Sequence, residues 1–306
     1  MSNTLLSYAL LILLAAIWGS SFLFIKVALG SITPLTIAAG RIALAGVILF
    51  VIMRVSGHHL PPRGRHWLFI GGAAALGNVL PFSLISFGER HVDSSLAAIM
   101  MSTIPLFTIL MAHIMTDDEK LSTEKSVGVA VGFVGVVILI GPAALLDLGA
   151  QTVGQLTIAC GALCYALSGI ISRNLRHLPK LQSSAAIMVV AALMIVPIAL
   201  IYDRPWTLSP TAIGVTSVVM LGVMATALAQ VVILWILQMR GASFLSLNNY
   251  LVPLFGVFWG AVFLSEWPGT HVKFAFAIIL LGVLIAQGGV TKLLHPRRKD
   301  VRKPVT

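Results

Sequence analysis

Ten long apolar stretches, separated by short polar segments, restrict the fold of this chain more than any single motif does. Each is long enough, or nearly so, to cross the roughly 30 Å hydrocarbon layer of a bilayer as an α-helix. Over the whole chain 58% of residues are hydrophobic and 10% are charged, whereas an ordinary soluble domain is about 25% charged. Too few polar groups remain to cover a surface in water, so the sequence predicts an all-α polytopic membrane protein.

The predicted spans form two groups of five. In the first half they cover residues 8–29, 34–53, 67–87, 94–115 and 126–146. In the second half they cover residues 153–171, 183–202, 211–237, 242–264 and 274–290.

The two halves carry the same apolar signature. Residues 104–107, Ile-Pro-Leu-Phe, return 148 positions later as Val-Pro-Leu-Phe at 252–255, and each copy is followed by an acid, Glu119 and then Glu266. Five is an odd number of spans, so the second copy enters the membrane from the opposite side. The sequence therefore predicts two inverted five-helix repeats, residues 1–148 and 149–291, followed by a basic tail at 292–306. Inverted repeats of this kind are typical of transporters, but channels can also contain them, so a pore stays an alternative at this step.

Basic residues predict the orientation, because cytoplasmic loops carry an excess of Lys and Arg. If the N-terminus is cytoplasmic, the inner loops and the tail hold fifteen Lys and Arg residues and the outer loops hold three. Six of the fifteen lie in the tail, where a cytoplasmic anchor facing anionic lipid explains them better than nucleic-acid binding does. We therefore expect ten spans with both termini in the cytoplasm of a bacterial inner membrane.

A family resemblance rests on motifs in both halves. The chain reads Ile-Trp-Gly-Ser-Ser-Phe at 17–22, with Lys26 after it, and then Pro34, Arg41 and the Pro-Leu-Phe of 105–107, which recurs at 253–255. In these features it resembles the ten-span EamA-type exporters of the drug/metabolite transporter superfamily. The resemblance implies export of amino acids, drugs, nucleosides or other metabolites, without selecting one. Tyr165 occupies the place in the second half that Trp18 holds in the first.

Ionisable residues inside a membrane are candidates for function, because a charge in hydrocarbon is costly. All ten carboxylates fall in loops, at span ends or in the tail, so we expect no buried acid to couple transport to protons. His113, the only histidine within a predicted span, could relay protons or could be a structural histidine. Transport is therefore expected to be exchange or facilitated diffusion, at most weakly proton-linked through His113.

Arg41 lies about two turns into the second predicted span. It could be a structural cation that binds backbone carbonyls of neighbouring helices or extends toward the membrane surface. Alternatively, it could bind a substrate carboxylate or phosphate bidentately. Lys26 is closer to the membrane surface, and Arg173, 147 positions later, is its counterpart in the second half. This symmetry favours a structural or gating role for Lys26 and Arg173.

Neutral polar and aromatic residues within the spans are the remaining candidates for a binding site. They could join helices by hydrogen bonds or line a wet cavity. The predicted substrate-binding set is Trp18, Asn78, Tyr165, Thr226, Asn248, Tyr250 and Arg41. Pro105 and Pro253 are predicted hinges in the fourth and ninth spans, because each removes a helical hydrogen bond.

Enzyme motifs are weak. His113 and Asp118 match the spacing of an acyltransferase pair, but no phosphate-binding loop, nucleophile elbow or metal-ligand cluster accompanies them. We therefore expect no catalytic residue, no cofactor and no metal. Together with the resemblance, which implies export, the sequence predicts a monomeric or homodimeric exporter of small amphipathic solutes such as amino acids, working by alternating access around a central cavity. The alternatives are a proton-coupled multidrug carrier and, less favoured, an intramembrane acyltransferase-like enzyme.

Overall fold

The computed structural model describes residues 3–141 and 149–288, and every regular element in these ranges is a helix. The first repeat contains α1 (Asn3–Ala28), α2 (Pro34–Val55), α3 (His66–Ala74), η1 (Ala75–Val79), α4 (Leu80–Gly88), α5 (Ser94–Met101), α6 (Ile104–Met115) and α7 (Thr123–Ile140). The second contains α8 (Ala150–Ile171), η3 (Ser172–Leu175), α9 (Lys180–Tyr202), η4 (Pro205–Thr207), α10 (Ala212–Gly222), η5 (Val223–Leu228), α11 (Ala229–Arg240), α12 (Ala242–Leu245), α13 (Asn248–Leu264) and α14 (Thr270–Ala286).

These elements form ten membrane spans within the described residues. Nine are at least 18 residues long and apolar enough to cross a bilayer, and α14 is a shorter apolar helix. The chain is thus a multi-pass helical membrane protein built from two repeats. The fifth span ends at Ile140, earlier than expected, because Gly141 adopts a φ of 85° directly before a proline. Leu146 and Val290, the predicted ends of two spans, lie outside the described residues.

Four spans are interrupted at related places. The third and eighth contain the π-helical segments η1 and η5, which begin 148 positions apart at Ala75 and Val223. In the third span Pro81 cannot donate to the carbonyl four residues earlier, and a wider turn accommodates that loss. The fourth span breaks between α5 and α6, just before Pro105, and the ninth breaks between α12 and α13.

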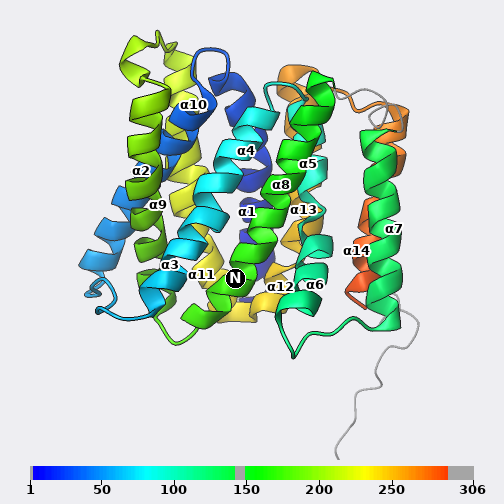
Figure 1. The fold of residues 1–306 in the computed structure, drawn as a ribbon, viewed down its shortest axis with the longest axis horizontal. Coiled ribbons are helices and arrows are strands. Elements are labelled where there is room, and N and C mark those ends of the chain that lie inside the picture. Colours follow the sequence, from blue (N-terminus) through cyan, green and yellow to red (C-terminus); the bar gives the residue numbers. More distant parts are fainter. Residues whose placement is uncertain (1–2, 142–148, 289–306) are drawn as a thin grey trace, which may run out of the picture.

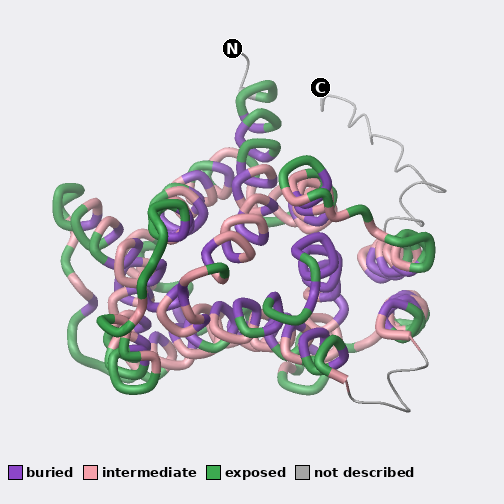
Figure 2. Tube along the Cα trace, turned by 90° about the horizontal axis from the view of Figure 1, so that it is seen from above, coloured by how far each residue is buried: buried purple, intermediate pink, exposed green. Residues whose placement is uncertain are grey.

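The loops alternate between two ends of the bundle (Figure 1). One end carries the loops 29–33, 89–93, 203–211 and 265–269, and we name it the Glu89 end. The opposite end carries the loops 56–65, 116–122 and 172–179, and we name it the Arg173 end. Buried residues face the interior of the bundle (Figure 2).

Small residues allow the closest helix contacts, as expected in a membrane where packing rather than hydrophobicity joins helices. A Cβ on Gly132 of α7 would lie 2.3 Å from Leu106, and a Cβ on Gly282 of α14 would lie 2.4 Å from the backbone of Gly132. The pair α7 and α14 lies at one edge of the bundle (Figure 1). Gly19 similarly lets α1 approach α13, where its Cβ would meet Phe255 at 2.6 Å.

Candidate functional site

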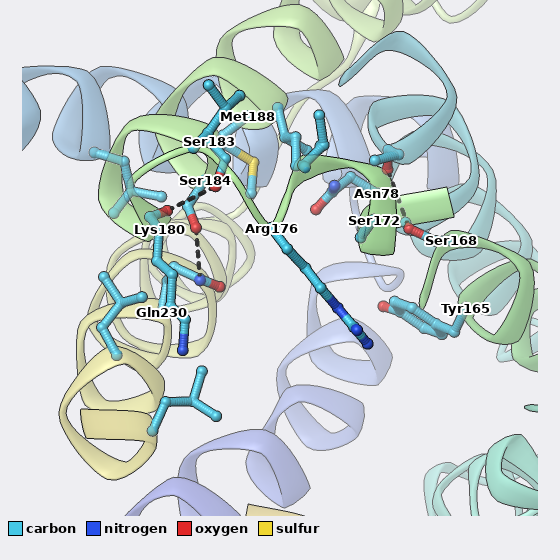
Figure 3. A pocket seen from close by; sticks show the side chains of 18 residues that line it. Asn78, Tyr165, Ser168, Ser172, Arg176, Lys180, Ser183, Ser184, Met188 and Gln230 are labelled. Carbon is cyan, nitrogen blue, oxygen red and sulfur yellow. Dashed lines mark hydrogen bonds between the residues drawn. The ribbon is translucent and has the colours of Figure 1, made fainter. Parts of the chain in front are cut away.

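A pocket of about 440 Å³ opens among the second, third, sixth, seventh and eighth spans (Figure 3). Its apolar lining includes Leu49 from α2, Met188 from α9 and Leu234 from α11. Its polar lining is Asn78, Tyr165, Ser168, Ser172, Arg176, Lys180, Ser183, Ser184 and Gln230. A concave, mostly apolar site with a few converging polar groups is the usual form of a small-molecule site.

The pocket reaches the Arg173 end of the bundle. Arg176 and Lys180 line it at this end. Arg176 lies in the connection between the sixth and seventh spans, and Lys180 is the first residue of α9. Arg176 extends into the pocket toward the side on which Tyr165 lies (Figure 3). No Asp or Glu is among the described residues that line this pocket. The site therefore has a positive rim and favours a ligand that carries an anionic group.

Helix geometry places the polar groups of the pocket. Asn78 lies in η1, where the wider π-turn interrupts the third span. Gly77, beside it, lets α8 approach so closely that a Cβ there would lie 2.4 Å from the Ser168 hydroxyl. Gln230 donates to the Ser184 hydroxyl at 2.9 Å, which joins α11 to α9. Ser168 donates to the Ala73 carbonyl at 3.4 Å, joining α8 to α3.

Two members of the predicted substrate-binding set, Asn78 and Tyr165, line the pocket together. The other members do not line it. Trp18 is half-buried on α1 against the main apolar core. Tyr250 donates through its hydroxyl to Gln287 at 3.1 Å, and Asn248 is buried without a hydrogen-bond partner for either side-chain amide atom.

Arg41 and Thr226 form a buried contact next to the pocket. The Arg41 Nε donates to the Thr226 hydroxyl at 2.8 Å, and the guanidinium carbon lies 3.7 Å from the centre of the Phe82 ring. Phe82 in turn packs edge-on against Tyr165, with 6.4 Å between ring centres. Arg41 is 5% exposed. Its partners here are a hydroxyl and an aromatic face, instead of the backbone carbonyls considered from the sequence.

The residues predicted to move or to relay protons lie away from the pocket. His113 accepts at Nδ1 from the Leu121 amide at 3.3 Å and is half-buried, and it does not line the pocket. Pro105 lies in the first turn of α6, directly after the break in the fourth span, whereas Pro253 lies inside α13. Both prolines are buried.

One carboxylate that the sequence places at a span end, Glu89, is buried in the fold. Glu89 directly follows the third span and is 0% exposed, and neither oxygen of its carboxyl group has a hydrogen-bond partner. Sequence position suggested a solvated span end. In the fold, Gly88 packs against Gly154 and Ile158 of α8, and Lys26 of α1 binds the Glu89 carbonyl, so neighbouring helices enclose the side chain.

Two other carboxylates at the Glu89 end join the repeats by capping helices. Asp203 accepts from the amide of Thr36 at 2.9 Å, in the first turn of α2. Glu266 accepts from the Ser94 hydroxyl at 2.6 Å and from the Ser95 amide at 3.2 Å, at the start of α5. A negative group at a helix N-terminus satisfies free amides and complements the helix dipole. At the Arg173 end, Arg173 instead pairs with Glu119.

Sequence reasoning missed Arg176, Lys180, Ser183 and Ser184 as parts of a site. All four belong to the ends of spans, where polar residues are ordinarily assigned to loops. The only signal was a helical one, since Ser183 and Ile187, and likewise Ser184 and Met188, are four residues apart on α9 and so lie on one face.

Comparison with known proteins agrees with this architecture. Residues 5–141 and 152–287 each match the EamA-like transporter family. The uncharacterized transporter YoaV of Bacillus subtilis is 24% identical over 276 residues, which cover 89% of this chain and 91% of the relative. The uncharacterized inner membrane transporter YedA of Escherichia coli is 25% identical over 302 residues, which cover 97% of this chain and 95% of the relative.

A relative with a named substrate class is more distant. The probable terminal-alkyne amino-acid exporter of Streptantibioticus cattleyicolor is 23% identical over 296 residues, covering 96% of each chain. A solved crystal structure shares the fold, with a TM-score of 0.65 and 19% identity over 97% of this chain and 99% of that one. Since the family match spans most of the sequence in two copies, the chain belongs to the EamA-like transporter family.

Proposed function

We propose that this transporter exports amino acids or similar small metabolites by alternating access, with the Arg173 end in the cytoplasm of a bacterial inner membrane. The observation that carries the proposal is the pocket itself, which opens at one end of two related repeats and carries a basic rim. Its volume of about 440 Å³ falls within the range of small-molecule sites.

The inverted repeats relate the pocket to a second set of residues. Tyr165 lines the pocket, and its counterpart Trp18, 147 positions earlier, does not. Asn78 lines the pocket, and its counterpart Thr226, 148 positions later, is buried against Arg41. In an inverted-repeat carrier the two halves exchange conformations between states. Trp18 and Thr226 would therefore face water when the Glu89 end is open.

The lining favours a ligand with a carboxylate and an apolar part. Arg176 and Lys180 supply positive charge, and Leu49, Met188 and Leu234 supply an apolar wall. An ammonium group would meet hydroxyls and the Tyr165 ring, whose face attracts cations. A purely cationic drug would meet no carboxylate on the described lining. These features support an amino-acid-like substrate over the multidrug alternative.

Counterflow in proteoliposomes tests the proposal. Vesicles loaded with each unlabelled amino acid of a panel should accumulate the labelled form transiently, with saturable kinetics. Arg176→Gln should raise the half-saturating concentration for a zwitterionic substrate, because it removes a charge from the rim. Arg240→Gln is the matched control, since Arg240 lies at the same end of the bundle and does not line the pocket.

Three results would contradict the proposal. Linear flux would indicate a pore, and counterflow of a lipophilic cation alone would indicate the multidrug alternative. Loss of activity in Arg240→Gln equal to that in Arg176→Gln would show that the rim has no special role.

His113→Ala should leave counterflow largely intact, because His113 contacts the loop amide of Leu121 and does not reach the pocket.

A further inference from the structure

Glu89 has an ionisable side chain that is enclosed without a hydrogen-bond partner for its carboxyl group. It is 0% exposed, and both carboxyl oxygens are without hydrogen bonds. An ionised carboxylate in such a place is very costly, whereas a neutral carboxylic acid costs much less. The geometry is therefore suited to the protonated form of Glu89 when the Glu89 end is closed.

The nearby cations are bound elsewhere. The Lys26 ammonium donates to the backbone carbonyls of Glu89 and Val92, at 2.8 and 2.6 Å, and does not pair with the Glu89 carboxyl. Arg41 binds Thr226 and stacks on Phe82. Both cations are nevertheless close enough to act on Glu89 through their charge.

The repeats show where Glu89 would lie in the other conformation. Glu89 corresponds to Leu237, which lines the pocket 148 positions later. Equivalent positions of the first and sixth spans are 147 residues apart, as for Trp18 and Tyr165. Ser21 therefore corresponds to Ser168, which also lines the pocket. The Ser21 hydroxyl, like the Glu89 carboxyl, is buried and has no partner. Two orphaned polar groups thus map onto the lining of the pocket.

We propose that Glu89 is the proton-binding group of this transporter: it is ionised in a water-filled cavity when the Glu89 end is open, and it takes up one proton before that end closes. The proton comes from water on that side and binds one carboxylate oxygen, giving a neutral carboxylic acid. This inference rests on the alternating-access function proposed above and adds the ion to which conformational change is linked.

The sign of the linkage follows from burial. Desolvation raises the pKa of Glu89 well above its usual range; Lys26 opposes the rise, Glu266 adds to it and Arg41 opposes it. The closed form therefore binds more protons than the open form, and a lower pH favours closure of the Glu89 end. Ser94 and Ser95 of α5 and Gln155 of α8, which are buried at the same end of the bundle, carry no charge. In its own loop, Arg90, His91 and Asp93 are exposed.

Thiol labelling tests the inference without a known substrate. In a background with Cys160 and Cys164 replaced, Ser21→Cys should react with a membrane-impermeant methanethiosulfonate added at the Glu89 end. The labelling rate of Ser21→Cys is divided by that of the exposed Ser209→Cys, which corrects for the effect of pH on the thiol itself. This ratio should rise with pH by up to about tenfold per pH unit, the limit for the release of one proton. Glu89→Gln, neutral at every pH, should hold reactivity low and independent of pH.

Matched variants separate Glu89 from its neighbours and from misfolding. Asp93→Asn and His91→Gln, in the same loop, should retain the pH dependence, and Glu89→Asp should retain it because it still titrates. A pH-dependent signal in Glu89→Gln, or a flat signal in the parent protein, would overturn the inference. Counterflow is measured in the same vesicles. If counterflow occurs but labelling of the parent protein does not depend on pH, the role of Glu89 is refuted and the transport function stands. If counterflow is absent, the proposed function itself is refuted.

Discussion

At the scale of single residues, the membrane interior makes each hydrogen bond of a buried polar side chain costly to lose. Thr226 shows this most directly, because its hydroxyl accepts from the Arg41 Nε at 2.8 Å and donates to the Leu221 carbonyl at 2.8 Å. The sequence suggested that Thr226 binds substrate. In this conformation its hydroxyl holds a buried guanidinium in place instead.

Replacing Thr226 should therefore act first on stability. Thr226→Val leaves the Arg41 donor unpaired and should reduce the free energy of unfolding by about 1–3 kcal/mol, measured as a lower unfolding midpoint in detergent. Thr226→Ser should restore most of the loss. Thr216→Val is the control, because Thr216 is bonded only to its own helix and is exposed. An equal loss in both valine variants would show that the contact with Arg41 is unimportant.

At the scale of helices, close packing and end contacts hold the spans in place. The pair α7 and α14 depends on the absence of side chains at Gly128, Gly132 and Gly282. Lys26 has a different role, since it joins the end of α1 to the turn after α4 through two carbonyls. Its repeat counterpart Arg173 pairs with Glu119 instead, so the two ends of the bundle are held differently.

Gly282→Val should separate α7 from α14. The new Cβ would lie 2.4 Å from the Gly132 backbone, which no rotamer relieves, so we expect a loss of about 1–3 kcal/mol from overpacking. Gly169→Ala is the control, because nothing lies within 4 Å of a Cβ there. Unfolding midpoints of the two variants in detergent give the comparison, and tolerance of Gly282→Val would indicate that the pair is looser than the structure shows.

Lys26→Gln should weaken closure of the Glu89 end. The amide cannot reproduce two charge-assisted hydrogen bonds to the carbonyls of Glu89 and Val92, so the open form should become more populated. The expected result is a several-fold rise in methanethiosulfonate labelling of Ser21→Cys. Lys273→Gln, which removes an exposed charge from the same end, should leave labelling unchanged. A fall in labelling for Lys26→Gln would mean that Lys26 stabilises the open form.

At the scale of the whole molecule, hydrophobic run lengths predicted the ten spans well, because hydrocarbon thickness restricts helix length. The recurrence of Pro-Leu-Phe predicted the two-repeat fold, because the motif lies in equivalent spans of the two halves. The site was harder to predict. Asn78 and Tyr165 were identified as polar groups in apolar helices, but Arg176 and Glu89 lie at span ends. Whether these two residues are exposed depends on which helices pack over them, and the local sequence does not contain that information.

Orientation in the membrane remains a prediction from the distribution of charge, with fifteen basic residues on one side and three on the other. It decides which side supplies the proton to Glu89 and which side loads the pocket. A phosphatase that is active only outside the cytoplasm should be inactive when fused after Thr306 and active when fused after Gln151, because these positions lie on opposite sides in a ten-span topology. A fluorescent protein that folds only in the cytoplasm should give the reverse pattern. Phosphatase activity at Thr306 would invert the assignment of the two ends, so that the basic rim of Arg176 and Lys180 would face outward and the pocket would serve uptake.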